Sequence, residues 1–240
     1  MIRVKLTNRD IQLMYDLYNN VFLSFEQIRR EHFKKCATST VYNRLSKLIK
    51  ANLVESLNVN LKANYLLAKD IGVIYFLTQK GLTKLKEYWH REIFRDFPAP
   101  LNVNNLFHDL LLTETLKKLK GSFNCEVLNT KVISLNQLSL EQIPDAILFN
   151  KNNKSQWAIE LELTAKSNQR YREIISNYST NQEFEKVLYI VKDEAIYKKI
   201  GGIISGYGKQ FQIGDYTGKF QFLYLKEFLA EQKREVCNEL

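Results

Sequence analysis

Between residues 157 and 163 the chain reads Trp157-Ala158-Ile159-Glu160-Leu161-Glu162-Leu163, an apolar run with two glutamates at alternate positions. Side chains of an extended strand alternate between the two faces of a sheet. Glu160 and Glu162 are therefore expected to share one face, and the large apolar side chains the other. Pro144-Asp145 opens a second apolar run, through Phe149. If the two strands pair, the Asp145 carboxylate can reach the two glutamates.

Three carboxylates in one place repel one another and raise one another's pKa unless a positive group lies among them. A hard divalent cation that takes oxygen ligands, Mg²⁺ or Mn²⁺, would relieve this repulsion. Two plainer interpretations stay open. Glu160 and Glu162 can belong to an edge strand with one wet face, where acids discourage sheet-to-sheet aggregation. Asp145 after a proline is also common in turns.

The basic residues of this chain are concentrated in its first part. The 240 residues are 45% apolar, enough for packed cores, and carry a formal charge of +9. Residues 1–97 hold 17 Lys and Arg against 9 Asp and Glu, whereas residues 98–240 hold 18 against 17. A basic domain beside a neutral one suggests an anionic partner for the first, most commonly nucleic acid, although a solvated surface gives the same count.

Cysteine usage and the apolar pattern predict a cytoplasmic protein without a membrane partner. The three cysteines are far apart and form no CxxC pair, which argues against zinc and disulfides and fits a reducing compartment. The first ten residues carry charges every few positions, unlike a signal peptide, and no run of about 18 apolar residues occurs.

Helical and strand-like patterns over residues 1–97 predict a winged helix-turn-helix domain. Thr7, Ser24 and Thr78 are placed to cap helices, and Thr38 or Ser39 to cap another. The expected elements are helices at 7–19, 25–32, 39–51 and 79–91, with strands at 53–57 and 73–78 before the last helix.

The helix at 39–51 is expected to lie in the major groove of double-stranded DNA. Its polar face carries Arg44, Lys47 and Lys50 for phosphates, and Thr40 and Asn43 nearer its start for base edges. The alternatives are that this domain binds protein, or that it only dimerises through its last helix. A homodimer is also compatible with DNA binding, since winged-helix proteins often pair to match two half-sites.

Two of the three prolines lie in Phe97-Pro98-Ala99-Pro100, which we interpret as a linker to a second domain at residues 101–240. There the pattern predicts a helix at 104–120, an extended segment at 125–135, strands at 145–149 and 157–163, a helix at 166–178 and a strand at 186–191. A helix, a glycine-rich turn, a strand near 220–225 and a final helix follow. The whole chain is expected to be α+β, with a central mixed sheet in the second domain.

This order, with Pro-Asp opening the second strand and two acids in the third, resembles the PD-(D/E)XK nuclease superfamily. Together with the winged helix, His108-Asp109-Leu110, Lys166-Ser167 and Arg170-Tyr171, it makes the chain similar to the replication-relaxation proteins of plasmids and other mobile elements. The resemblance covers roughly residues 5 to 195.

The resemblance assigns a metal to Asp145 and Glu160 and implies metal-assisted phosphodiester hydrolysis. The third position of the pattern is normally lysine, but here it is Glu162, which occurs in some active members and in inactive descendants alike. Lys166 can replace that lysine from the next helix, where Arg170 shares its face and is a candidate for contact with DNA. His108 is either a catalytic residue or a hydrogen-bonded packing residue.

Three functions follow from these patterns. The first is a DNA-binding protein of a plasmid, phage or other mobile element whose nuclease-like domain hydrolyses DNA with Mg²⁺ or Mn²⁺. The second is a catalytically inactive regulator of transcription or replication that uses its second domain for dimerisation or partner binding, which the missing lysine favours. The third is an adaptor that binds protein through both domains.

Overall fold

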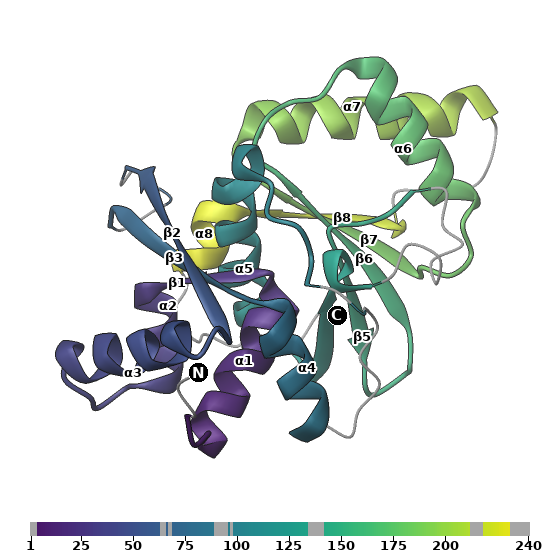
Figure 1. Cartoon of the computed structure of the whole chain (residues 1–240). Helices are drawn as coiled ribbons and strands as arrows, with labels where there is room; N and C mark the ends of the chain where they lie inside the picture. The colour runs from purple at the N-terminus through teal and green to yellow at the C-terminus, as the bar shows by residue number, and fades with distance from the viewer. Residues whose placement is uncertain are drawn as a thin grey trace. The chain divides into compact units, whose positions relative to one another are not determined.

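The computed structural model describes residues 4–62, 66, 69–88, 96, 98–133, 142–211 and 218–230 (Figure 1). The chain divides into two units, Met1–Leu110 with Lys131–Ser134, and Leu111–Thr130 with Leu135–Leu240. The division falls inside helix α5 (Leu106–Ser122), whereas the sequence pattern puts the boundary at residues 97–101.

The first unit is a set of helices around a small antiparallel sheet of strand order β1-β3-β2. Figure 1 shows β2 and β3 extending past the helices as a long hairpin. In chain order its elements are α1 (Asn8–Asn20), β1 (Phe22–Ser24), α2 (Phe25–His32), α3 (Thr38–Lys50), β2 (Val54–Leu61), β3 (Ile71–Leu77), α4 (Gln79–Tyr88) and the 3-10 turn η1 (Val103–Asn105) before α5.

Side-chain caps define where three of these helices begin. The hydroxyls of Thr7, Ser24 and Thr78 each accept a bond from a backbone N–H three residues on, at 3.4, 3.2 and 2.9 Å. These caps of α1, α2 and α4 are as predicted. Helix α3 differs, because its N-cap is Ala37 and no side chain caps it. The prediction of a Thr38 or Ser39 cap is therefore wrong.

Strand β1 was not predicted, because it has only three residues and continues directly into α2. It pairs with β3 so that Phe22 faces Phe76, which places the start of α2 beside the sheet. Helix α4 begins close to Leu53, the residue before β2. A Cβ on Gly81 would lie 2.0 Å from the Leu53 carbonyl oxygen, so only glycine fits there.

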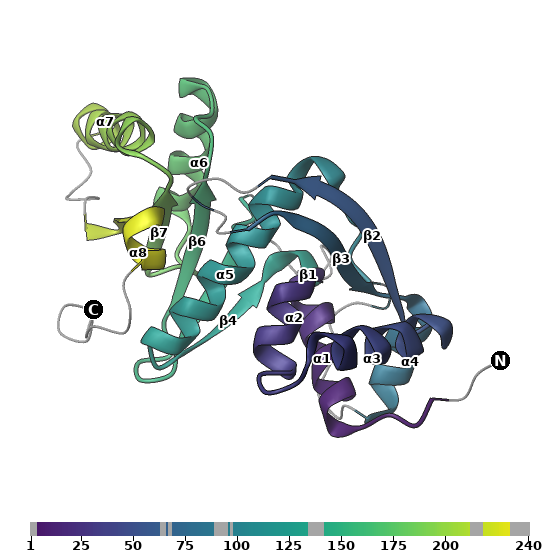
Figure 2. The ribbon, with the colours of Figure 1, turned by 90° about the vertical axis from the view of Figure 1, so that its left-hand side faces the viewer.

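The second unit is a five-stranded mixed sheet of order β4-β5-β6-β7-β8. The β4–β5 and β5–β6 pairs are antiparallel, and β6–β7 and β7–β8 are parallel. Helices α6 and α7 lie along one face and α5 along the other (Figure 2). Its further elements are β4 (Cys125–Asn129), η2 (Thr130–Val132), β5 (Ala146–Asn150), β6 (Gln156–Glu162), α6 (Asn168–Thr180), β7 (Lys186–Val191), α7 (Glu194–Phe211), β8 (Phe220–Tyr224) and α8 (Leu225–Ala230).

The predicted α+β class and mixed sheet are confirmed, but three details differ. Strand β6 is central, so the interpretation of Glu160 and Glu162 as residues of an edge strand is wrong. The glycine-rich turn was predicted from six glycines between Gly201 and Gly218, but Gly201, Gly202 and Gly206 lie inside α7. Extended structure after Cys125 stops at Asn129. The predicted element ends at residues 91 and 135, and the final helix beyond residue 230, lie outside the described residues.

Within the described part of the chain, no helix combines the length and apolar character that crossing a lipid bilayer requires.

Candidate functional site

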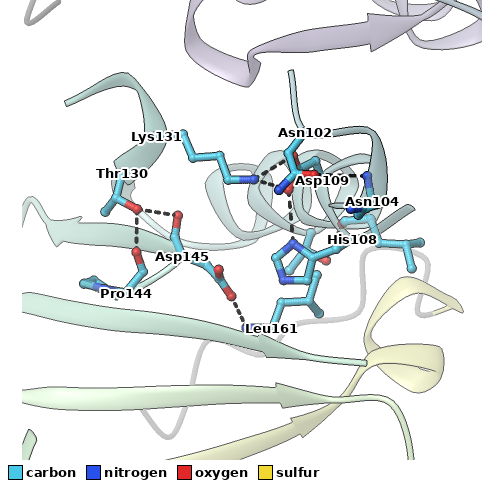
Figure 3. Close-up of polar contacts among 11 residues, drawn as sticks. Asn102, Asn104, His108, Asp109, Thr130, Lys131, Pro144, Asp145 and Leu161 are labelled. Atoms are coloured by element: carbon cyan, nitrogen blue, oxygen red, sulfur yellow. Dashed lines mark hydrogen bonds and ion pairs between the residues drawn. The ribbon is translucent and has the colours of Figure 1, made fainter. Parts of the chain in front are cut away.

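Strands β5 and β6 pair as the sequence predicts, and this pairing positions Asp145. Ala146 lies opposite Ile159, so extending the register by one residue places Asp145 opposite Glu160, on the same face of the sheet. The Asp145 backbone N–H bonds to the Ile159 carbonyl at 3.0 Å. Its carboxylate accepts a bond from the Leu161 N–H at 2.8 Å (Figure 3). Backbone and side chain together fix this carboxylate at the start of β5.

The turn before β5 is held by the hydroxyl of Thr130. It donates to the carbonyl oxygen of Pro144 and lies 3.0 Å from that of Asp145 (Figure 3). Pro144 and Thr130 are buried, so Asp145 leaves a turn that is itself tightly bonded.

Glu160 is buried and accepts bonds from two hydrogen-bond donors. Its carboxyl receives bonds from the Tyr178 hydroxyl and, at 3.2 Å, from the Gln142 amide. The residue is only 5% exposed. Burial, and then the neighbouring Asp145 charge, raise the pKa of Glu160 to about 8. This carboxyl is therefore mostly protonated at neutral pH.

Glu162 is neutralised differently, by an ion pair. The Lys166 ammonium bonds one of its oxygens, and the Tyr171 hydroxyl lies 3.3 Å from the other. Burial raises the pKa of Glu162, and the positive charge of Lys166 opposes that shift. Lys166 lies two residues before α6 and contacts Glu162, while its role as a replacement for the missing lysine stays a prediction.

Three tyrosines complete the layer around the two glutamates. Tyr171 and Tyr178 are buried on α6, which covers this face of the sheet, and Tyr189 lies beside Glu160 in the β6–β7 register. Burial raises the pKa of Tyr171 to about 12, and it also raises the pKa of Tyr178 and of Tyr189 above the ordinary value. Within the described residues the Tyr189 hydroxyl has no hydrogen-bond partner.

These contacts define an acid layer, made of Asp145, Glu160, Glu162, Lys166, Tyr171, Tyr178 and Tyr189. Its carboxyl groups are satisfied by protein donors. Over the described ranges, no group of three or more His, Cys, Asp or Glu side chains is arranged to hold a metal ion. A cation at Glu162 would have to displace Lys166 or Tyr171, and one at Oε1 of Glu160 would have to displace Tyr178. The described acid layer therefore has no preformed Mg²⁺ or Mn²⁺ site.

His108 belongs to the first unit and has a separate set of contacts. Its Nδ1 lies 3.2 Å from an Asp109 carboxylate oxygen, and the Lys131 ammonium lies 2.5 and 2.6 Å from the two oxygens of that carboxylate (Figure 3). Asp109 is buried. His108 is thus one member of a compact charge cluster, and its catalytic role stays a prediction.

Four of the five predicted DNA contacts on α3 share its solvent face. Thr40, Asn43, Lys47 and Lys50 are exposed, and the structure gives no described partner for either lysine. The α3 sequence contains no carboxylate. Its opposite face is buried through Val41, Leu45 and Leu48. We call the exposed residues of this helix, Thr38, Ser39, Thr40, Tyr42, Asn43, Ser46, Lys47 and Lys50, the polar face of α3.

Arg44, the fifth predicted contact, is already bonded to other residues of the first unit. Its guanidinium bonds both oxygens of Asp10, one at 2.8 Å, and the Lys5 carbonyl at 2.9 Å. Burial alone would raise the pKa of Asp10, but the bonds from Arg44 and Thr7 outweigh burial and lower it. Arg44 fastens α3 to α1, so we leave it out of the proposed DNA contacts.

Arg170 lies on the exposed side of α6, 3.3 Å from Glu173 in a solvent-exposed ion pair. Arg170 is therefore not part of the acid layer, and its contact with DNA stays a prediction.

Sequence reasoning missed the partners of the predicted residues more than the residues themselves. A spacing of seven residues places Tyr171 and Tyr178 on one helix face, but nothing local in the sequence indicates that their hydroxyls meet the glutamates. Asp10 had a local signal, because an acid three residues after Thr7 forms a capping box. Its second role, holding Arg44, depends on the packing of α1 against α3.

Comparison of the chain with protein-family models, with curated proteins and with solved structures finds no match.

Proposed function

We propose that this chain is a double-stranded DNA-binding protein of a plasmid, phage or other mobile element, and that its first unit is a winged helix-turn-helix. The order α1-β1-α2-α3-β2-β3-α4, with an antiparallel sheet of order β1-β3-β2, is the arrangement expected of that domain. In such a domain α3 enters the major groove and the β2–β3 hairpin approaches a neighbouring stretch of backbone.

The polar face of α3 is the observation that carries this proposal. The face combines unpartnered ammonium groups with short polar side chains, and no carboxylate on α3 opposes a phosphate. Lys47 and Lys50 contact phosphates, which position the helix without reading sequence. Asn43 and Thr40 have the donors and acceptors that distinguish base edges. The excess of positive charge in residues 1–97 agrees with this assignment.

Salt dependence of binding tests the proposal on duplex DNA of random sequence. Each lysine that neutralises a phosphate contributes about one to the slope of log affinity against log salt. Lys47→Gln and Lys50→Gln should each lower the slope by about one while the fold is retained. Lys198→Gln is the matched control, because Lys198 is an exposed lysine of the second unit, 2.9 Å from Glu194. A flat salt response of the wild-type protein contradicts DNA binding and favours the adaptor.

For the second unit we propose a nuclease-like fold that serves the DNA-binding unit by dimerisation or partner contact. The order α5-β4-β5-β6-α6-β7 agrees with the PD-(D/E)XK pattern. The acid layer is neutralised from within, which favours the regulator over the hydrolase. The resemblance to replication-relaxation proteins supports the assignment to a mobile element.

Hydrolysis of DNA phosphodiesters is the second candidate function, and one observation favours it. Asp145, Glu160, Glu162 and Lys166, the predicted catalytic set apart from His108, come together at β5, β6 and the start of α6. Because the carboxyl groups are engaged by protein donors, no catalytic step through a cation follows from this arrangement.

Nicking assays with Mg²⁺ or Mn²⁺ on supercoiled, linear and single-stranded DNA distinguish the two roles of the second unit. If it is a hydrolase, cleavage is lost in Glu160→Ala and kept in Glu173→Gln, an exposed acid of α6, with DNA affinity unchanged in both. No cleavage of any of the three substrates removes the hydrolase and leaves the regulator.

A further inference from the structure

Tyr42 is an aromatic side chain left half-exposed on the polar face of α3. Its exposed fraction is 50%, although the preceding residue, Val41, is fully buried. Ser39 and Ser46, three residues before and four after it, are exposed on the same side of the helix. Tyr42 is therefore the one large apolar surface among small and polar groups on the exposed face of this described helix.

The Tyr42 ring is held in place before any partner arrives. It stacks on Phe25, the first residue of α2, with ring centroids 4.2 Å apart and an interplanar angle of 15°. A ring fixed on one side by stacking loses little conformational freedom when its other side is covered.

The chemistry around Tyr42 selects its partner. The polar face of α3 carries Lys47 and Lys50 and no carboxylate. This charge favours an anionic partner over an apolar protein surface without acidic residues. In the major groove of DNA, the apolar group that base pairs display is the C5-methyl group of thymine. Cytosine shows a hydrogen at that position and an amino group beside it.

We infer that Tyr42 reads the thymine methyl group, so that the DNA site bound by this protein contains a thymine at one fixed position under α3. This inference rests on the proposed DNA binding. Tyr42 is a specificity-determining residue, whereas Lys47 and Lys50 bind every sequence alike.

Selection from a pool of random duplex DNA, followed by single-atom changes in the selected site, tests the inference. The wild-type protein should select a site with one fixed thymine that Tyr42→Ala no longer requires. Replacing that thymine by deoxyuridine, which lacks only the methyl group, should weaken wild-type binding about fourfold, as expected for one buried methyl group. Tyr42→Ala should bind both duplexes equally, and Tyr42→Phe, which keeps the ring, should still distinguish them.

A second measurement avoids dependence on how the variants fold. The same thymine is replaced by 5-iodouracil, and the complex with wild-type protein is irradiated. The crosslinked residue should be Tyr42. Crosslinking to another residue, or equal wild-type affinity for the thymine and deoxyuridine duplexes, overturns the inference while leaving DNA binding intact. Absence of any salt-dependent duplex binding removes the proposed function itself.

Discussion

Charged side chains gather on β6 of the second unit and on α3 of the first, but their charges are compensated in different ways. In the acid layer, Glu162 is paired with Lys166 and Glu160 is bonded by Tyr178. On the polar face of α3, the described structure gives Lys47 and Lys50 no partner. Burial forces this difference, because an unpaired charge is expensive away from water and inexpensive in it. Compensated charges hold the fold, and uncompensated ones remain available to a partner.

Helix α3 contains both situations within one turn. Arg44 bonds the fully buried Asp10, whereas Lys47 points into solvent three residues later. Counting basic residues along the sequence treats the two alike. Only the contact between α1 and α3 separates the structural cation from the two lysines that remain in solvent.

The largest expected effect tests whether Glu160 is compensated by a proton. The unfolded chain releases this proton near the ordinary pKa of 4.5, whereas the folded state holds it to about 8. Between these values the folded state binds more protons, so the free energy of unfolding falls as pH rises. The contribution is on the order of 3–4 kcal/mol between pH 5 and pH 8. Glu160→Gln, which keeps an acceptor for Tyr178, should remove it.

Urea denaturation of both proteins at pH 5 and pH 8 measures this contribution. The variant should be the more stable of the two at pH 8 and nearly equal to wild type at pH 5. Taking the difference between the proteins cancels the titration of the other carboxyl groups. A difference that does not change with pH would show that Glu160 is ionised in the fold, and would reopen the acid layer as a cation site.

The next effect separates the two kinds of cation on α3. Arg44→Met leaves the buried Asp10 carboxylate without its cation and should lower the free energy of unfolding by about 3 kcal/mol. Lys47→Met, the same change on the polar face, should stay within about 0.5 kcal/mol. Thermal or urea unfolding measures both.

Adding Asp10→Asn to Arg44→Met should recover part of the lost stability, because no buried charge then remains. Equal costs for Arg44→Met and Lys47→Met would mean that Arg44 is as free as Lys47. Arg44 would then return to the DNA contacts predicted from the sequence.

The sequence predicted helices and strands better than it predicted the burial and bonding partners of individual side chains. Alternation across residues 157–163 gave the correct strand and placed Glu160 and Glu162 on one face, because side-chain direction in a strand is a local property. It could not decide between an edge and a central strand. That depends on β7, whose parallel pairing with β6 requires a crossover through α6. The strand and face of Glu160 and Glu162 could be predicted, but the groups that balance their charges could not.

The starts of α1, α2 and α4 were also local and were predicted well, since a hydroxyl and an N–H three residues on belong to one turn. The predicted cap of α3 was wrong, because Ala37 precedes that helix. Strand β1 was not predicted, because three residues give no periodicity and its existence depends on β3. The same limit applies to Tyr42. Its stacking on Phe25 joins residues of two helices, and the residues on either side of Tyr42 give no sign of it.

The smallest expected effect compares two tyrosines of the acid layer that differ in one hydrogen bond. Tyr178→Phe deletes a donor to Glu160 and leaves a buried carboxyl less satisfied, which should cost about 1–2 kcal/mol of unfolding free energy. Tyr189→Phe deletes a buried hydroxyl that has no described partner, so it should be neutral or slightly stabilising. Denaturation of the two variants under one set of conditions measures the contrast, because both rings are fully buried and lose the same atom. A substantial cost for Tyr189→Phe would mean that its hydroxyl is bonded in solution, by water or an ion, and that the acid layer is not compensated by protein groups alone.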